Sequence, residues 1–209
     1  MNSGAFLMQV KASRARGLFP ADARPYDRFM ADTLTLWHVE HVNFGRLLDL
    51  LERQLASFER GDSPDYELML EIMYYMTHYS DVLHHPKEDL VFARIRERDA
   101  NACATIDRLS GEHATLKRAG QELVQELDGV LDGSIMSRKR IDAAGRAYLA
   151  MLREHMRVEE TEILPLAARL LGPSDWASID AAIRQFHDPL FGTRTERRYA
   201  GLARHIRGA

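Results

Sequence analysis

The chain contains a histidine and a glutamate four residues apart at two places, each within an apolar helical pattern. The first pair is His84 with Glu88, and the second is His155 with Glu159. Residues four apart lie on the same face of a helix, so each pair projects in one direction. Because polar groups are costly to bury alone, both pairs need partners on other helices. The fold must therefore bring several helices around one polar cluster.

Each pair is preceded by a single histidine that directly follows a glutamate. His41 lies 43 residues before His84, and His113 lies 42 residues before His155. The two halves of the chain therefore resemble each other. This repeat predicts two helix hairpins related by a pseudo-twofold axis.

Apolar residues at helical spacing predict four long helices with turn residues between them. We therefore expect an all-α fold, an up-and-down antiparallel four-helix bundle formed by a domain of residues 26–209. Residues 1–25 lack a sustained period and are expected to form a short N-terminal arm. Short C-terminal helices are expected from about residue 173. The four helices are expected at residues 26–60, 65–98, 102–131 and 137–171.

A bundle lets each helix place one histidine in a common core, where two glutamates can bridge two metal ions. Four imidazoles and two carboxylates would be costly to bury together without a cation. Two positions per ion remain for other ligands, which suits six-coordinate iron or manganese better than tetrahedral zinc. The predicted ligands are His41, His84, Glu88, His113, His155 and Glu159.

Several other residues near the six predicted ligands are weaker candidates for a role at the site. His38, one turn before His41, is a further candidate ligand. His85 and Lys87 fall off the ligand stripe and are expected at the surface or behind the ligands. Pro86 lies within the first histidine-glutamate pair and Pro165 follows the second, and each is expected to kink its helix or free a carbonyl group. Four tyrosines are candidates for proton or electron relay, although tyrosines in such helices more often serve plain packing: Tyr74, Tyr75, Tyr79 and Tyr148.

Composition excludes several functional classes. With 209 residues, 45% hydrophobic and 28% charged, the chain resembles one ordinary globular domain. A net charge of −3 gives no indication of nucleic-acid binding, and no apolar run is long enough for a membrane span. Cys103 is the single cysteine, which excludes an internal disulfide or a thiolate cluster. The N-terminal region does not resemble a secretory signal, so we expect a cytoplasmic protein.

Between about residues 28 and 171, the repeated His-x-x-x-Glu and the upstream histidines resemble the hemerythrin-like family, also called HHE cation-binding domains. The resemblance is closest to the branch with four His and two Glu, which includes bacterial iron-centre repair proteins. It implies two iron ions, bridged by carboxylates and an oxo or hydroxo group, on the six predicted ligands. Manganese or zinc are the alternative metals.

Three differences from related di-iron proteins limit which of their functions this chain can share. Oxygen-carrying hemerythrins have a second histidine four residues after the one on the third helix, where this chain has Lys117. This difference argues against simple reversible oxygen carriage. The repair proteins usually have an additional cysteine-containing N-terminal domain, which some 25 residues cannot form. The Glu-x-x-His pattern of ferritin-like di-iron proteins does not occur in the chain.

The expected function is that of a di-iron protein that binds, senses or handles oxygen, nitric oxide, peroxide or iron. A di-iron oxidase or peroxidase is one alternative. A metal-stabilised interaction module, with the segment after Pro173 as its docking surface, is the other. Small ligands such as O2 or NO are the expected partners. The oligomeric state stays open, with a homodimer as one option.

Overall fold

The computed structural model describes residues 25–183 and 188–208, and these residues form helices and turns without any strand. The predicted helical fold is confirmed, whereas the expected N-terminal arm lies almost entirely outside the described residues. The main helices are α1 (Pro25–Glu59), α2 (Tyr66–Tyr75), α3 (His85–Arg96), α4 (Cys103–Leu131), α5 (Arg138–Val158) and α6 (Leu164–Leu170). A 3-10 turn, Ala100–Ala102, precedes α4.

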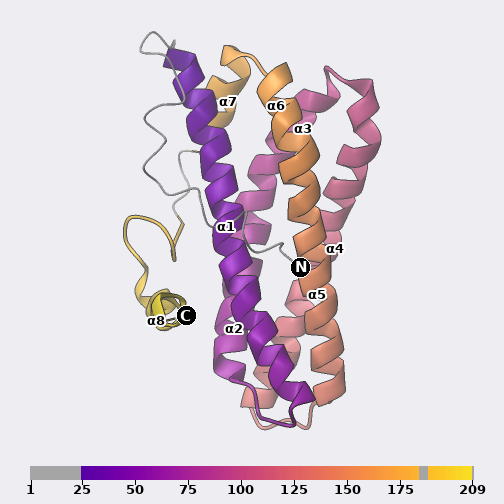
Figure 1. The fold of residues 1–209 in the computed structure, drawn as a ribbon, viewed down its shortest axis with the longest axis vertical. Coiled ribbons are helices and arrows are strands. Elements are labelled where there is room, and N and C mark those ends of the chain that lie inside the picture. Colours follow the sequence, from indigo (N-terminus) through magenta and orange to yellow (C-terminus); the bar gives the residue numbers. More distant parts are fainter. Residues whose placement is uncertain (1–24, 184–187, 209) are drawn as a thin grey trace, which may run out of the picture.

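The helices run side by side along the long axis of the molecule as a bundle (Figure 1). α1 contacts α2 and α5, and α4 contacts the same two helices. Two turns at the lower end in Figure 1 reverse the chain, and each contains a glycine with a positive φ, Gly61 at 77° and Gly133 at 82°. Glycine adopts this conformation without the steric cost that other residues incur. The bundle therefore consists of two helix hairpins, as the repeat predicts.

Two π-helical segments interrupt the bundle, at Met76–His84 and at Glu159–Ile163. In each, a backbone N–H bonds the carbonyl five residues back: His85 bonds Ser80, and Leu164 bonds Glu159. Pro86 and Pro165 are near the start of the α-helix that follows. Proline has no N–H to continue an α-helical ladder, and π segments occur frequently at functional sites. The prolines therefore accompany local changes in helical register.

The apolar core is divided into two clusters. One fills the end of the bundle that contains Phe44 and Leu152, and the other fills the end that contains Trp37 and Val158. On α1, His41 lies between Trp37 and Phe44; on α5, His155 lies between Leu152 and Val158. The predicted polar residues therefore form a layer between two apolar clusters that pack the helices above and below it.

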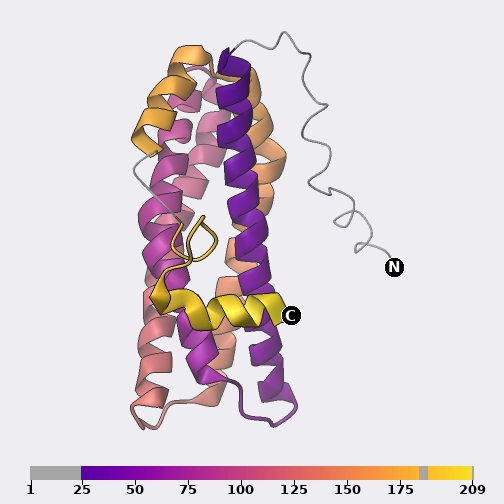
Figure 2. The same cartoon turned by 90° about the vertical axis from the view of Figure 1, so that its left-hand side faces the viewer.

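The C-terminal region adds α7 (Pro173–Ile183), a 3-10 turn (Arg197–Tyr199) and α8 (Ala200–Gly208). This confirms the prediction of short C-terminal helices, although residues 184–187 of the expected first one lie outside the described residues. α8 crosses the bundle over α1 and α2 (Figure 2) and buries Leu202 completely. Across the described ranges, no helix has the length and apolar character that a membrane span requires.

Candidate metal centre

The six predicted ligands come together in one buried cluster. All are at most 7% exposed, and Glu159 is completely buried. Within each helical pair the polar atoms are close: Nε2 of His84 lies 2.7 Å from Oε1 of Glu88, and Nε2 of His155 lies 3.2 Å from Oε1 of Glu159. The spacing of four residues therefore brings each histidine against its own glutamate.

The single histidines of α1 and α4 face both glutamates. Nε2 of His41 lies 3.3 Å from Glu88 and 3.4 Å from Glu159. Nε2 of His113 lies 3.3 Å from Glu88 and 3.9 Å from Glu159. Trp37 on α1 also donates its indole N–H to Nε2 of His41 at 3.0 Å. Each carboxylate thus lies between imidazoles from both halves of the chain, which is the arrangement that a bridging ligand needs.

Three oxygens in this cluster are buried without a hydrogen-bond partner in the described part of the chain. They are Oε2 of Glu88 and both carboxylate oxygens of Glu159. A buried carboxylate whose oxygens are unsatisfied costs several kcal/mol unless a cation compensates it. The donor set of imidazole nitrogens and carboxylate oxygens is one that iron, manganese and zinc all accept. The residues present therefore fit a metal site.

A carboxylate contacts the other ring nitrogen of each of the four histidines. In the first type of contact, the glutamate that precedes a single histidine reaches the histidine of the next pair. Glu40 lies 2.7 Å from Nδ1 of His84. Glu112 lies 2.9 Å from Nδ1 of His155. The same contact is thus made in both halves of the chain.

In the second type of contact, the acidic residue directly after each paired glutamate reaches a single histidine. Glu160 lies 2.8 Å from Nδ1 of His41, and Asp89 lies 3.2 Å from Nδ1 of His113. A carboxylate only accepts hydrogen bonds, so Nδ1 of His41, His84 and His155 carries a proton. The contact of Asp89 with His113 is an ion pair, in which Nδ1 of His113 has no hydrogen bond among the described residues. In the neutral imidazole, Nε2 is then the nitrogen that can bind a metal, and at His41 a metal would displace the hydrogen bond from Trp37. Outer carboxylates of this kind orient histidine ligands and increase their basicity.

The charges of the cluster shift its pKa values strongly. Burial alone would lower the pKa of His41, but hydrogen bonds with Glu160 and Glu88 raise it to about 10. Burial would also lower the pKa of His113, but Asp89, Glu159 and Glu88 raise it to about 11. These carboxylates favour positive charge on the imidazoles, as expected for an environment built to accept cations.

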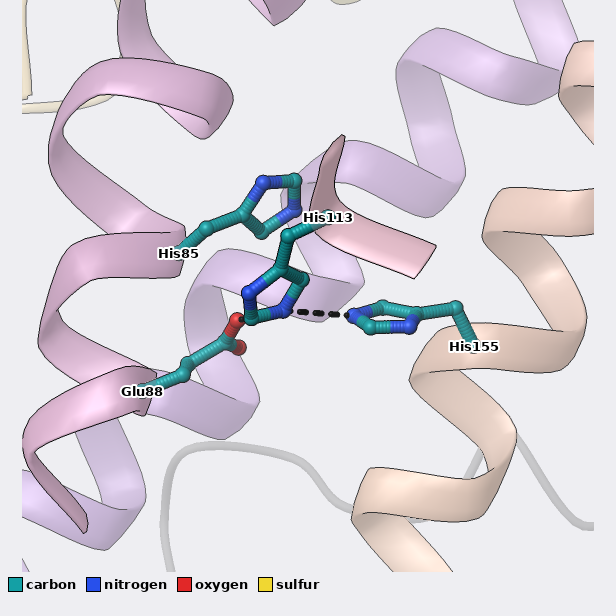
Figure 3. A group of neighbouring side chains, drawn as sticks. All are labelled: His85, Glu88, His113 and His155. Atoms are coloured by element: carbon teal, nitrogen blue, oxygen red, sulfur yellow. Dashed lines mark hydrogen bonds and ion pairs between the residues drawn. The ribbon is translucent and has the colours of Figure 1, made fainter. Parts of the chain in front are cut away.

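His85 contradicts the expectation of a surface position. It is 3% exposed, and its ring stacks on that of His113 with centroids 4.2 Å apart (Figure 3). Ligand atoms of His85, Glu88, His113 and His155 all lie within 4.8 Å of one another. The π segment explains the error, because a wider turn rotates the residue after His84 toward the core. A fifth imidazole therefore belongs to the cluster.

His85 also follows the contact pattern of the other histidines. Its Nδ1 lies 3.4 Å from Oδ1 of Asp81, and Ser80 Oγ lies 3.2 Å from its Nε2. Both oxygens of Asp81 are buried without a hydrogen-bond partner among the described residues. Burial raises the pKa of Asp81 to about 7, against the opposing influence of Lys117 and His113.

The remaining candidates lie outside the ring of ligands. His38 is largely exposed, and its Nδ1 lies 3.0 Å from Glu160. Lys87 is half-buried and donates to Glu40 at 2.8 Å, behind the histidine that Glu40 contacts. Sequence reasoning missed the acidic residue after each paired glutamate. The signal was available, because Asp89 and Glu160 occupy equivalent positions in the two halves.

The helical bundle and its buried cluster of histidines and glutamates indicate that this is a metal-binding protein. The chain belongs to the hemerythrin family: the hemerythrin HHE cation-binding domain matches residues 32–167, more than half of the chain. The matched range contains all six predicted ligands as well as His85. No curated protein and no solved structure gave a significant match.

Proposed function

We propose that the chain binds two iron ions in this cluster and uses them to bind or handle a small ligand such as dioxygen, nitric oxide or peroxide. Glu88 and Glu159 are the proposed bridging ligands. His41 and His84 would bind one ion, and His113 and His155 the other, with an oxo or hydroxo group as a further bridge. Bridged iron ions of this kind supply open coordination positions and reversible redox change. Manganese and zinc are the alternative metals.

The observation that carries the proposal is the set of unsatisfied carboxylate oxygens beside imidazole nitrogens. Oε2 of Glu88 and both oxygens of Glu159 have no hydrogen-bond partner among the described residues. Imidazole Nε2 atoms from both halves of the chain lie 2.7–3.4 Å from these two side chains. Cations placed between these atoms would remove the burial cost of both carboxylates.

The protein's own groups hold the site ready for small ligands. The outer carboxylates fix each histidine with Nε2 directed inward. The apolar clusters on both sides of the layer restrict the access of water. His85 is a further candidate ligand on the side of His113 and His155, because its ring already lies against that of His113. His85 would supply an additional imidazole in place of the histidine that oxygen-carrying hemerythrins have where this chain has Lys117.

Elemental analysis and an optical spectrum of the purified protein test this proposal. We expect about two iron atoms per chain after expression in iron-replete medium, since the donors suit two six-coordinate ions. The spectrum should change when the reduced protein meets oxygen or nitric oxide. At most one bound metal, with all six residues intact, would overturn the proposal.

Metal removal separates this function from that of a metal-stabilised interaction module. The two apolar clusters hold the helices together on both sides of the polar layer, so the chelated protein should keep its helical circular dichroism and lose its reactivity. Unfolding on chelation would instead favour a structural role for the metal.

A further inference from the structure

One of the four outer carboxylates also bonds a tyrosine. Oε2 of Glu40 faces Nδ1 of His84, and its Oε1 accepts a hydrogen bond from the Tyr79 hydroxyl at 2.5 Å. Lys87 donates to the same oxygen at 2.8 Å and holds the carboxylate in place. Among the residues that the structure describes, no tyrosine hydrogen-bonds the other three outer carboxylates. The tyrosine contact therefore breaks the pseudo-twofold symmetry of the site.

A second tyrosine, Tyr75, packs against Tyr79 on the side away from the cluster. The ring of Tyr75 stacks on that of Tyr79, with centroids 5.2 Å apart and an interplanar angle of 19°. The Tyr75 hydroxyl donates to Oδ2 of Asp188 at 3.0 Å. The ring of Tyr199, next to α8, meets Tyr75 edge-on at 5.5 Å. Both stacked tyrosines thus have a carboxylate acceptor of their own, and an aromatic path leads toward the C-terminal segment.

We propose that Tyr79 and Tyr75 form an electron relay that reduces the metal centre after a peroxide has oxidised it. The proposal rests on the proposed function. Reduction of one hydrogen peroxide to two waters takes two electrons from the site together with two protons from the solvent, and in the first step Tyr79 gives one electron back. The Tyr79 O–H bond breaks as its proton crosses the hydrogen bond to Oε1 of Glu40, which leaves a neutral tyrosyl radical.

In the second step, Tyr75 gives an electron to the Tyr79 radical and its phenolic proton to Asp188. Tyr79 regains its proton from Glu40, so after both steps the metal centre holds one more electron, Tyr75 carries the radical and Asp188 carries the proton of Tyr75. Each transfer needs a proton acceptor at the hydroxyl, because a phenol gives up an electron readily only when its proton leaves as well. The hydrogen bonds of Tyr79 with Glu40 and of Tyr75 with Asp188 place a carboxylate oxygen at each hydroxyl.

Tyr148 provides a matched comparison. It is 1% exposed, as Tyr79 is, and it also lies in the apolar core of the bundle. Its hydroxyl has no hydrogen bond to a carboxylate within the described ranges, and burial together with Asp81 raises its pKa well above the usual value. Tyr148 therefore has the burial of a relay residue without the acceptor, which suits it as a control.

Electron paramagnetic resonance of the iron-loaded protein tests the relay. The reduced protein is mixed with hydrogen peroxide and frozen, and the organic radical is quantified beside the metal content of the same sample. We expect a radical whose spectrum narrows when the tyrosine rings are deuterated. Tyr79→Phe should lose most of this radical while keeping its iron, and Tyr148→Phe should keep both.

Equal radical in Tyr79→Phe and the wild type would overturn the relay, and so would an iron-loaded wild type that forms none. Failure to bind iron at all would instead refute the proposed function. If Tyr79→Phe loses iron, Tyr75→Phe decides the question. That variant removes only the second step, so the radical on Tyr79 should persist longer, and an unchanged lifetime would overturn the proposal.

Discussion

Single residues show how the chain prepares imidazoles to act as ligands. His84 contacts Glu40 through Nδ1 and Glu88 through Nε2, and His155 makes the equivalent contacts with Glu112 and Glu159. Because a carboxylate accepts only, the outer contact fixes the proton on Nδ1 and leaves Nε2 for the cation. The glutamate that precedes each single histidine therefore determines which ring nitrogen of the paired histidine can bind the metal.

Replacement of Glu88 by alanine should cost the protein more metal than replacement of His38. Glu88 is 1% exposed and contacts three imidazoles, whereas His38 contacts the outer Glu160 and is largely exposed. A bridging ligand holds both ions, so its removal affects both. Metal content per chain, measured on the two purified variants, makes the comparison. Equal losses would place His38 among the ligands.

Metal binding near neutral pH should release at least one proton per chain. His113, whose pKa of about 11 reflects Asp89, Glu159 and Glu88 opposing burial, is protonated there in the metal-free protein. Its protonation stabilises the metal-free fold fully below the unfolded pKa of about 6.5, and this contribution disappears as pH rises through about 11. Cation and proton compete, so metal affinity should increase with pH.

Calorimetric titration in two buffers of different ionisation enthalpy measures the protons released. A binding enthalpy that is independent of the buffer would show that no proton leaves, and would contradict the assignment of His113 as a ligand that is protonated in the metal-free state.

At the scale of helices, the sequence predicts the long elements well and their local register poorly. Apolar spacing places the four helical stretches within a few residues of their observed bounds. It assumes a uniform α-helical turn, so the π segments at Met76–His84 and Glu159–Ile163 could not be found from it. This assumption misplaced His85, whereas the six predicted ligands lie together in the core and their role as ligands stays a prediction. Pro86 and Pro165 were the available signals of irregular register.

Close packing between α1 and α5 provides a test at this scale. A Cβ at Gly145 would lie 2.8 Å from Cδ2 of Leu55, a side chain that is completely buried. Gly145→Ala should therefore lower the free energy of unfolding by about 1 kcal/mol, since overpacking outweighs the gain in helix propensity. Gly111→Ala, on the exposed face of α4 with nothing within 4 Å, should raise it by up to about 1 kcal/mol.

Chemical denaturation of the two variants measures both changes under identical conditions. Stabilisation by Gly145→Ala equal to that by Gly111→Ala would show that the α1–α5 contact is looser than the structure indicates.

At the scale of the whole molecule, a polar layer lies between two apolar clusters and joins two similar hairpins. The internal repeat predicts this symmetry, and Glu40 with His84 and Glu112 with His155 make equivalent contacts in the two halves. The repeat could not predict where the halves differ. Tyr79 and His85 lie on the first hairpin, and their roles depend on tertiary contacts with Glu40 and His113.

Anomalous diffraction from crystals of the metal-loaded protein, recorded at the iron absorption edge, tests the central claim most directly. We expect two peaks in the polar layer, both in contact with Glu88 and Glu159. One peak should lie beside His41 and His84, and the other beside His113, His155 and His85. A single peak, or two peaks elsewhere on the chain, would contradict a dinuclear centre built from these residues.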